Sequence, residues 1–321
     1  MKRKYRPGCL GHLYQRGCKG YVVFYNIKDS LVFFTIFMLV AEKYGIRVSG
    51  LCLMYNHYHV DFEAERPYLV SRFISEFCTM FSKTYNHRYG FSGHLFDRHG
   101  ISNKWGDKSK RTAYAYLYNN PVEWHLCSRA EEYRWNFLRY SQEDNPFSKK
   151  IASRNMTVRL RKALNLVRYL RSKRRPILYE TLDNILDPLD TYEKQYLVDF
   201  IVNEYSVIDY HRAVACYGSY QKMTDAFSNN TGNEYDIDEE FDPSAGKDYR
   251  KMAVFLARDK RYKDIGEVVH RPAEERLAYL NEIVEKCGVS VEHARKFLRI
   301  DVADLINDDH THSTRHGCLT D

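Results

Sequence analysis

The first 140 residues alternate between apolar segments with strand spacing and apolar segments with helical spacing. Residues 8–26 (GCLGHLYQRGCKGYVVFYN) place glycines around a β-rich segment, which predicts a strand, a turn and a second short strand. Residues 28–44 predict an apolar helix that Gly45 ends. Residues 46–65 (IRVSGLCLMYNHYHVDFEAE) predict one strand or two collinear strands.

Two further helices are expected in the same region. Residues 67–86 carry an apolar stripe with helical spacing, formed by Leu69, Phe73, Phe77, Met80 and Phe81. A basic loop from Arg98 to Lys110 leads to a helix over residues 111–119, which Pro121 terminates. The order strand, helix, strand, helix, helix predicts a small α/β sandwich.

The rest of the chain changes character after a polar segment. Residues 141–155 are turn-rich and predict a linker between an N-terminal unit, residues 1–140, and a helical remainder. Residues 156–270 predict a helical region with an exposed acidic loop at 229–246, and residues 271–308 a further helical segment. The fold class expected from this order is α+β, with an all-α C-terminal region.

The last helical segment leaves two interpretations open. Residues 273–300 contain a helix, the short turn Gly288-Val289-Ser290 and a second helix, as in the opening of a DNA-binding helix-turn-helix. The segment that follows is shorter and more acidic than expected for a helix that reads a DNA groove. A small helical bundle for partner contact or packing is the alternative.

Charge is divided unevenly along the chain. Residues 1–175 carry 32 Lys and Arg against 13 Asp and Glu, whereas residues 176–321 carry 17 against 29. The excess in the first half indicates a nucleic-acid partner more than a merely solvated basic surface. Aromatic residues make up 15% of the chain and are interleaved with the basic ones, as stacking on unpaired bases requires.

The composition of the chain indicates the cellular compartment in which the protein is expected. The longest apolar run, residues 31–41, is shorter than the roughly 20 residues that cross a bilayer. The basic N-terminus lacks the apolar stretch of a secretory signal. Eight cysteines without a CxxC pair predict reduced thiols. A cytoplasmic protein without a membrane partner is therefore expected.

The pair His57 and His59 is the first candidate for chemistry. Alternate residues of a strand share a face, so both imidazoles point one way while Tyr58, Val60 and Phe62 point towards packed helices. The spacing suits the binding of one cation. Taken alone the pattern is weak, because paired histidines in a strand are more often structural.

A second element supports the first. Tyr116 and Asn120 lie four residues apart on a predicted helix and so project from the same face. A phenol becomes an effective nucleophile only with a base or cation nearby, and an amide oxygen can join two histidines as a metal ligand. The alternative is that Tyr116, like its neighbours Tyr114 and Tyr118, is a half-buried aromatic of the packing.

Four segments in this order resemble the REP-associated tyrosine transposases and related single-strand insertion-sequence transposases of the HUH type. MYNHYHV at 54–60 resembles the family's MPNHxH strand, and YLYNNPV at 116–122 resembles its YIxxNPV helix. Between them NHRYGFSGHLFDR resembles NRRYGRSGHLFQxR, and HLYQRG at 12–17 resembles HVxNRG. The resemblance covers about residues 8–140.

The resemblance implies a fold, an activity and a set of site residues. The N-terminal unit would be a ferredoxin-like sandwich with an antiparallel sheet, an HUH transposase domain that takes part in DNA transposition and recombination. Tyr116 matches the nucleophile, which forms a 5′-phosphotyrosine and leaves a free 3′-OH at hairpin-associated sites. His57, His59 and Asn120 match the ligands of Mg²⁺ or Mn²⁺. The expected partner is single-stranded or hairpin DNA, bound by a monomer or a homodimer.

The chain departs from the family pattern at several positions. Tyr55 replaces the usual proline, and Asp61 lies on the histidine face, where it could add a carboxylate to the metal site or contact solvent; we favour solvent. After Arg98 the loop differs from the family's basic and aromatic run. The candidate phosphate contacts are Arg16, Arg98, Lys104, Lys108, Lys110 and Arg111.

Three functions compete on these observations. The first is the metal-dependent transposase, and the second is a domesticated, non-catalytic DNA- or RNA-binding regulator that keeps the fold. A pure binding protein has no need for His57, His59, Tyr116 and Asn120 together, which favours the enzyme. A histidine phosphohydrolase would need a further catalytic histidine or a second HxT-like element, which the sequence does not place convincingly.

Overall fold

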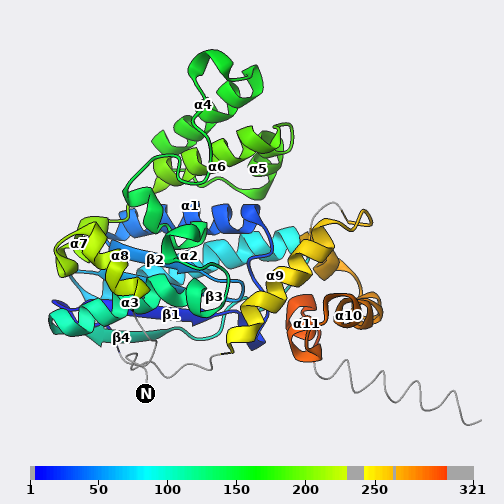
Figure 1. The fold of residues 1–321 in the computed structure, drawn as a ribbon, viewed down its shortest axis with the longest axis horizontal. Helices are drawn as coiled ribbons and strands as arrows, with labels where there is room; N and C mark the ends of the chain where they lie inside the picture. Colours follow the sequence, from blue (N-terminus) through cyan, green and yellow to red (C-terminus); the bar gives the residue numbers. More distant parts are fainter. Residues whose placement is uncertain (1–3, 230–241, 263–264, 302–321) are drawn as a thin grey trace, which may run out of the picture.

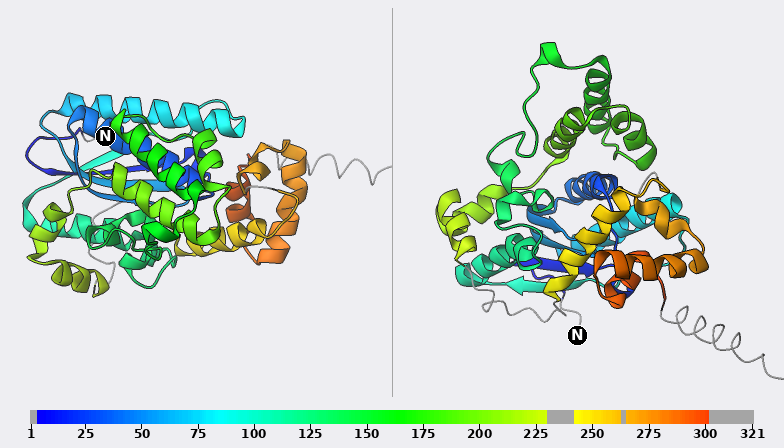
Figure 2. Two further views of the ribbon diagram at one scale, coloured as in Figure 1. Left: turned by 90° about the horizontal axis from the view of Figure 1, so that it is seen from above. Right: turned by 45° about the vertical axis from the view of Figure 1, so that its right-hand side comes forward.

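The computed structural model describes residues 4–229, 242–262 and 265–301. One four-stranded antiparallel sheet carries helices on both faces, and further helices pack at its side and ends (Figures 1 and 2). This is the α+β class expected from the sequence. No helix among the described residues is both long and apolar enough to cross a membrane.

The N-terminal unit contains all four strands. Its elements are β1 (Leu10–Arg16), α1 (Ile27–Tyr44), β2 (Arg47–Leu53), β3 (His57–Glu63), α2 (Pro67–Tyr89), β4 (Gly100–Lys104) and α3 (Gly106–Glu123). The strand order across the sheet is β2-β3-β1-β4, and every neighbouring pair is antiparallel. Strands β1 and β3 are therefore the central pair of the sheet. Strand β3 contains the paired histidines.

The pairing register of β1 and β3 decides which residues share a face. Arg16 lies opposite His57, Tyr14 opposite His59 and His12 opposite Asp61. Directly opposed residues of an antiparallel pair project to the same side of the sheet. One face of the central pair consequently carries His12, Tyr14, Arg16, His57, His59 and Asp61.

The opposite face forms the main apolar core. Tyr58 is buried and lies in edge contact with Phe33 of α1 and Phe77 of α2, with ring centroids 4.9 and 6.0 Å apart. Helices α1 and α2 cover this face together (Figure 1). The apolar residues of β3 on this face thus pack against α1 and α2, as the alternation in sequence predicts.

The helix boundaries agree with the sequence at α1 and α2 but not at α3. Asn26 and Asp29 form a capping box at the start of α1, and Gly45 ends it in the left-handed conformation. Pro121, expected to terminate the helix, instead lies within α3, which continues to Glu123. Proline removes one backbone donor, so α3 loses one internal hydrogen bond at Pro121 and ends two residues later.

The strand expectations need three corrections. Residues 46–65 are not collinear strands but a hairpin of β2 and β3, closed where the Met54 N–H bonds the His57 carbonyl at 2.9 Å. The segment after Gly20 is extended but forms no second strand within 8–26. The basic loop contains β4, because Ile101 and its neighbours pair with the exposed edge of β1.

The helical remainder begins with a layer stacked on α1. Its elements are α4 (Val158–Ser172), α5 (Tyr179–Leu186), α6 (Thr191–Tyr205), α7 (Tyr210–Tyr217), α8 (Tyr220–Ser228), α9 (Pro243–Ala257), α10 (Ala273–Cys287) and α11 (Val291–Leu298). Helices α4 to α6 lie beyond α1, and α7 and α8 lie beside α3 (Figure 1). The region 156–270, expected to be helical, contains the six helices α4 to α9 among its described residues. Most of the predicted acidic loop, residues 230–241, lies outside the described residues.

Buried Asp29 joins three elements of this arrangement. Its carboxylate accepts hydrogen bonds from the hydroxyls of Tyr89 in α2 and Tyr179 in α5, at 2.7 and 2.8 Å. It also accepts the backbone N–H groups of Tyr25 and Asn26. Asp29 is fully buried, so the four donors replace the water it loses.

The expected linker and the last helices are both packed against other elements. Within 141–155, the Phe147 N–H and the Ser148 hydroxyl bond the buried carboxylate of Asp199 in α6. Helix α11 lies against the extended segment 21–25, where the Tyr25 hydroxyl bonds the Phe297 carbonyl at 2.7 Å.

The buried position of α11 favours packing over groove reading. Arg295 donates to Glu292 and to the Ile300 carbonyl, and Arg299 donates to the Val22 carbonyl. These cations are therefore engaged within the fold. Residues 273–300 contain the two helices α10 and α11, and the contacts of α11 are those of a helix packed within the fold.

We predict that Asp29→Ala lowers the free energy of unfolding by about 3 kcal/mol, because it leaves several buried donors without an acceptor. Tyr179→Phe removes one of these bonds and should cost about 1 kcal/mol. Urea unfolding of both variants measures the difference. Equal losses would show that the freed donors find other acceptors.

Candidate metal and tyrosine site

The candidate site lies between the polar face of β1 and β3 and one face of α3. Tyr116 and Asn120 project from that face of α3, four residues apart as expected. Tyr116 is 7% exposed and its ring lies 5.2 Å from that of His59 and 5.6 Å from that of His12. Asn120 faces His57, with its Oδ1 atom 3.2 Å from the imidazole Nε2. The structure therefore brings Tyr116, His57, His59 and Asn120 together.

A chain of hydrogen bonds orients His57. The Asn56 amide donates through Nδ2 to the Gly20 carbonyl at 3.2 Å, which turns its Oδ1 atom towards His57. Nδ1 of His57 lies 2.7 Å from that oxygen and donates to it. Nε2 of the neutral ring then carries a lone pair, and it faces Asn120 Oδ1. Two acceptors in this position fit a cation between them.

A second chain orients His59. Nδ1 of His12 lies 2.8 Å from the Asp61 carboxylate, which can only accept. The other nitrogen of the His12 ring, Nε2, lies 3.3 Å from Nδ1 of His59. A proton on Nδ1 of His59 bridges the two rings and leaves the lone pair of His59 on Nε2. This buried nitrogen has no hydrogen-bond partner among the described residues.

Burial keeps both candidate ligands neutral. Loss of water lowers the pKa of His57 to about 3, although its contact with Asn120 opposes the shift. Burial, together with neighbouring His57 and His12, lowers the pKa of His59 well below 6.5. The neutral imidazole is the form that binds metals.

The donor set fits a divalent cation only when the amide is included. Among the residues that the structure describes, no group of three or more His, Cys, Asp and Glu is arranged to hold a metal ion. The buried lone pair of His59 and the facing pair of His57 and Asn120 are the observations that fit such an ion. Two imidazoles and one amide oxygen leave further coordination positions for water or phosphate.

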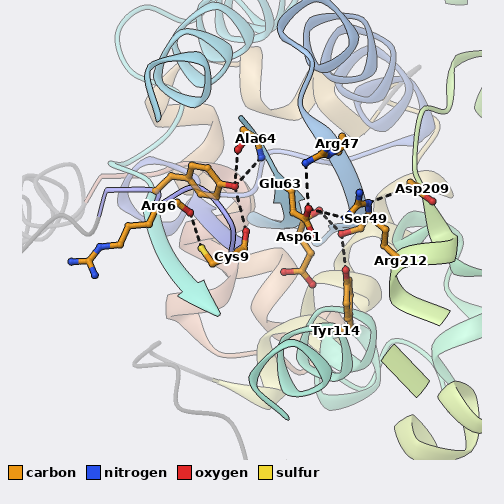
Figure 3. A network of polar contacts seen from close by, with 11 residues as sticks. Arg6, Cys9, Arg47, Ser49, Asp61, Glu63, Ala64, Tyr114, Asp209 and Arg212 are labelled. Carbon is orange, nitrogen blue, oxygen red and sulfur yellow. Dashed lines mark hydrogen bonds and ion pairs between the residues drawn. The ribbon is translucent and has the colours of Figure 1, made fainter. Parts of the chain in front are cut away.

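The neighbours of Tyr116 on α3 have a different environment. Tyr114 donates to the Ser49 hydroxyl at 2.9 Å, and Tyr118 donates to the Ser49 carbonyl at 3.3 Å. Burial raises the pKa of both phenols. Figure 3 shows Tyr114 and Ser49 beside Asp61, and the Ser49 hydroxyl of β2 donates to the Asp61 carbonyl at 3.2 Å. The packing interpretation thus holds for Tyr114 and Tyr118, whereas Tyr116 faces the histidines.

The environment of Asp61 differs from the one that we favoured from the sequence. We expected solvent contact, but Asp61 is fully buried and bound to His12. Helix α3 covers this face of β2 and β3 and excludes water from the Asp61 side chain. Its second oxygen, Oδ2, has no hydrogen-bond partner among the described residues.

The structure also adds residues that the motifs did not single out. His12 and Asn56 orient the two imidazoles, and the Trp124 ring lies 5.0 Å from that of His57. His12 stands two and four residues from Tyr14 and Arg16 in β1, a strand spacing that could have placed it on the same face. Its pairing opposite Asp61 depends on the register.

The six candidate DNA contacts do not form one cluster. Half-buried Arg16 lies beside the site, and its charge contributes to the lowered pKa of His57. Exposed Arg98 is next to it in space, because the Asp97 N–H bonds the Arg16 carbonyl. The other four lie at the end of β4 or in the first turns of α3, and they are Lys104, Lys108, Lys110 and Arg111.

We predict that, without metal, His59 carries its proton on Nδ1, because His12 is positioned to accept it. Long-range ¹H–¹⁵N NMR spectra in EDTA report the tautomer, with exposed His94 as an internal reference. His12→Phe removes the acceptor and should release His59 to a mixture of tautomers. A proton on Nε2 of His59 in the unchanged protein would contradict the hydrogen-bond chain.

Comparison with known proteins gives little beyond this geometry. No family model and no curated protein matches the chain. Among solved structures it is similar to one described as a REP-associated tyrosine transposase bound to a REP hairpin, at 13% sequence identity and a TM-score of 0.37. That similarity covers 49% of this chain and 97% of the other.

Proposed function

We propose that this protein is a metal-dependent DNA strand-cleaving and strand-joining enzyme of the transposase type, with Tyr116 as its nucleophile. The observation that carries the proposal is the convergence of Tyr116, His57, His59 and Asn120 in one buried site. These are the residues that the motifs single out. A packing role accounts for Tyr114 and Tyr118 but gives no reason for a buried imidazole nitrogen that lacks a partner among the described residues.

The fold supports the proposal at the level of topology. The connection order strand, helix, strand, strand, helix, strand with the sheet order β2-β3-β1-β4 is the one that a ferredoxin-like sandwich has. We assign residues 1–140 to this domain, with the helical segments as additions to it. The two imidazoles lie on its central strand, and the tyrosine lies on the helix across from them.

Each site residue has a definite task in the proposed reaction. His57, His59 and Asn120 would hold Mg²⁺ or Mn²⁺, which supplies positive charge to the scissile phosphate. As the bond from Tyr116 Oη to phosphorus forms, the phenol loses its proton and the bond from phosphorus to the 3′ oxygen breaks. The 3′ oxygen leaves with the electron pair and takes up a proton. The 5′ phosphate remains on the tyrosine.

The substrate we propose is single-stranded DNA next to a hairpin, handled in the cytoplasm by a monomer or a homodimer. A phosphotyrosine conserves the energy of the broken bond, so a free 3′-OH can attack it and rejoin the strand without an external energy source. The basic first half of the chain supplies phosphate contacts, foremost Arg16 beside the site.

The second candidate is a non-catalytic nucleic-acid-binding regulator. Burial of the site favours it, since Tyr116 is 7% exposed and a strand would have to enter between α3 and the sheet. A regulator would bind the same hairpins but form no covalent product. The two functions therefore differ in one measurement.

We expect Tyr116→Phe to abolish the covalent protein–DNA adduct while DNA binding changes little, because only the nucleophilic oxygen is removed. A labelled single-stranded hairpin from DNA flanking the gene is incubated with Mn²⁺ or EDTA and analysed on a denaturing gel. Tyr114→Phe is the matched control, since that hydroxyl bonds Ser49. It should keep the adduct. Tight hairpin binding without any adduct in the unchanged protein would favour the regulator.

Removal of a candidate metal ligand should affect metal binding as well as cleavage, unlike removal of the Tyr116 hydroxyl. His57→Ala should abolish metal-dependent cleavage and weaken Mn²⁺ binding, measured by calorimetry, because one imidazole donor is removed. His94→Ala changes an exposed histidine and is the control. Cleavage that persists in His57→Ala would remove this residue from the metal site.

A further inference from the structure

A groove lined by cations lies outside the candidate site, between α9, the end of α3 and the end of α10. It encloses about 810 Å³. Its charged lining residues are Lys247, Arg250, Lys251, Arg258 and Lys286. Within the described part of the chain, no carboxylate lines it. The feature is unexpected from sequence, because the half of the chain that contains it is acidic overall.

Helix α9 presents these cations because its two faces differ. Ala245, Tyr249, Met252 and Leu256 recur at helical spacing and are buried. The cations of α9 fall between them in sequence, and all are exposed. The helix therefore attaches through one apolar face and leaves its cations on the other. From Lys247 to Arg258, the residue that follows the helix, eleven residue steps give the basic face a length of about 16 Å.

The cations have few partners within the fold. Lys251 lies 3.4 Å from Asp248, and Arg250 donates to the Leu126 carbonyl at 3.1 Å. For Lys247, Arg258 and Lys286, the described residues provide no ion pair. Five cations that share one nearby counter-ion, Asp248, repel one another unless an anion joins them, so the groove is suited to a polyanion.

The groove begins at the edge of the candidate site. Gly246 packs so closely on Trp124 that a Cβ atom there would lie 2.5 Å from the Trp124 carbonyl oxygen. The Trp124 ring in turn contacts His57. Figures 1 and 2 show α9 starting beside α3 and running diagonally past one end of the sheet. Two residues of the groove lining, Lys247 and His125, directly follow Gly246 and Trp124 in the chain.

We propose that this groove binds the sugar–phosphate backbone of the single strand that leads to Tyr116. The cations bind successive phosphates, and Phe255 and His125 in the lining offer rings for base stacking. The direction of the strand rests on the proposed function, whereas binding of the polyanion does not. Helices α9 and α10 thereby extend the DNA surface beyond the N-terminal domain.

The test measures how binding depends on salt. The full chain with Tyr116→Phe, kept in EDTA so that no cleavage occurs, is titrated into a fluorescent single-stranded oligonucleotide at several salt concentrations. Lys247→Gln, Lys251→Gln and Lys286→Gln are added together. Each phosphate that the protein no longer neutralises lowers the logarithmic salt slope by about 0.7, so the slope should fall by about 2.

The matched control removes the same number of charges elsewhere. Lys150→Gln, Lys162→Gln and Lys173→Gln change exposed lysines in the segment before α4, in α4 and directly after it. Helix α4 lies on the far side of α1 from the sheet (Figure 1). This variant should keep the slope of its parent. All substituted lysines are exposed, and equal melting temperatures of the variants confirm that folding is unaffected.

The outcomes separate this inference from the proposed function. An unchanged slope in the groove variant, or a parent that does not bind the oligonucleotide, overturns the inference. If an adduct forms on Tyr116 but the salt slope is unchanged, the proposed enzyme activity is supported and only the proposed role of the groove is overturned. A reduced slope without any adduct in the wild-type protein supports the groove and overturns the enzyme.

Discussion

The pairing register between β1 and β3 is the constraint on which the rest of the site depends. A strand alternates its faces residue by residue, so a slip of one position would move every polar side chain of β1 into the apolar layer. Gly11 makes the register specific, because it lies opposite Phe62 and a Cβ atom there would come within 2.8 Å of that ring. The packing of one glycine against one phenylalanine thereby aligns His12 with Asp61.

The site that results is polar but almost closed to water. Burial disfavours protonation of His57 and His59, and hydrogen bonds with Asn56 and His12 determine which nitrogen of each ring is free. An orientation fixed in this way requires no rearrangement when a cation binds, which is the usual advantage of a preorganised ligand. The same burial limits access, so the proposed reaction requires that a strand reaches Tyr116 from the edge of the site.

Helices α9 and α11, which follow the N-terminal unit in the chain, use their cations in two different ways. Helix α11 uses its cations in bonds to segment 21–25 and to its own helix, and its buried face holds the C-terminal part against the domain. Helix α9 attaches by its apolar face and leaves its cations outside the core. A region with an acidic composition can thus still present a basic surface where one helix concentrates its charges.

The sequence by itself determined the elements and the chemistry that local pattern controls. Strand alternation assigned His57 and His59 to one face, helical spacing put Tyr116 beside Asn120, and Gly45 marked the end of α1. Only the tertiary structure decided the hairpin of β2 and β3, the pairing of β4, and the burial of Asp61 against His12. Register, burial and the gathering of cations from α9 and α10 depend on contacts between residues far apart in the chain, and local pattern carries no information on those distances.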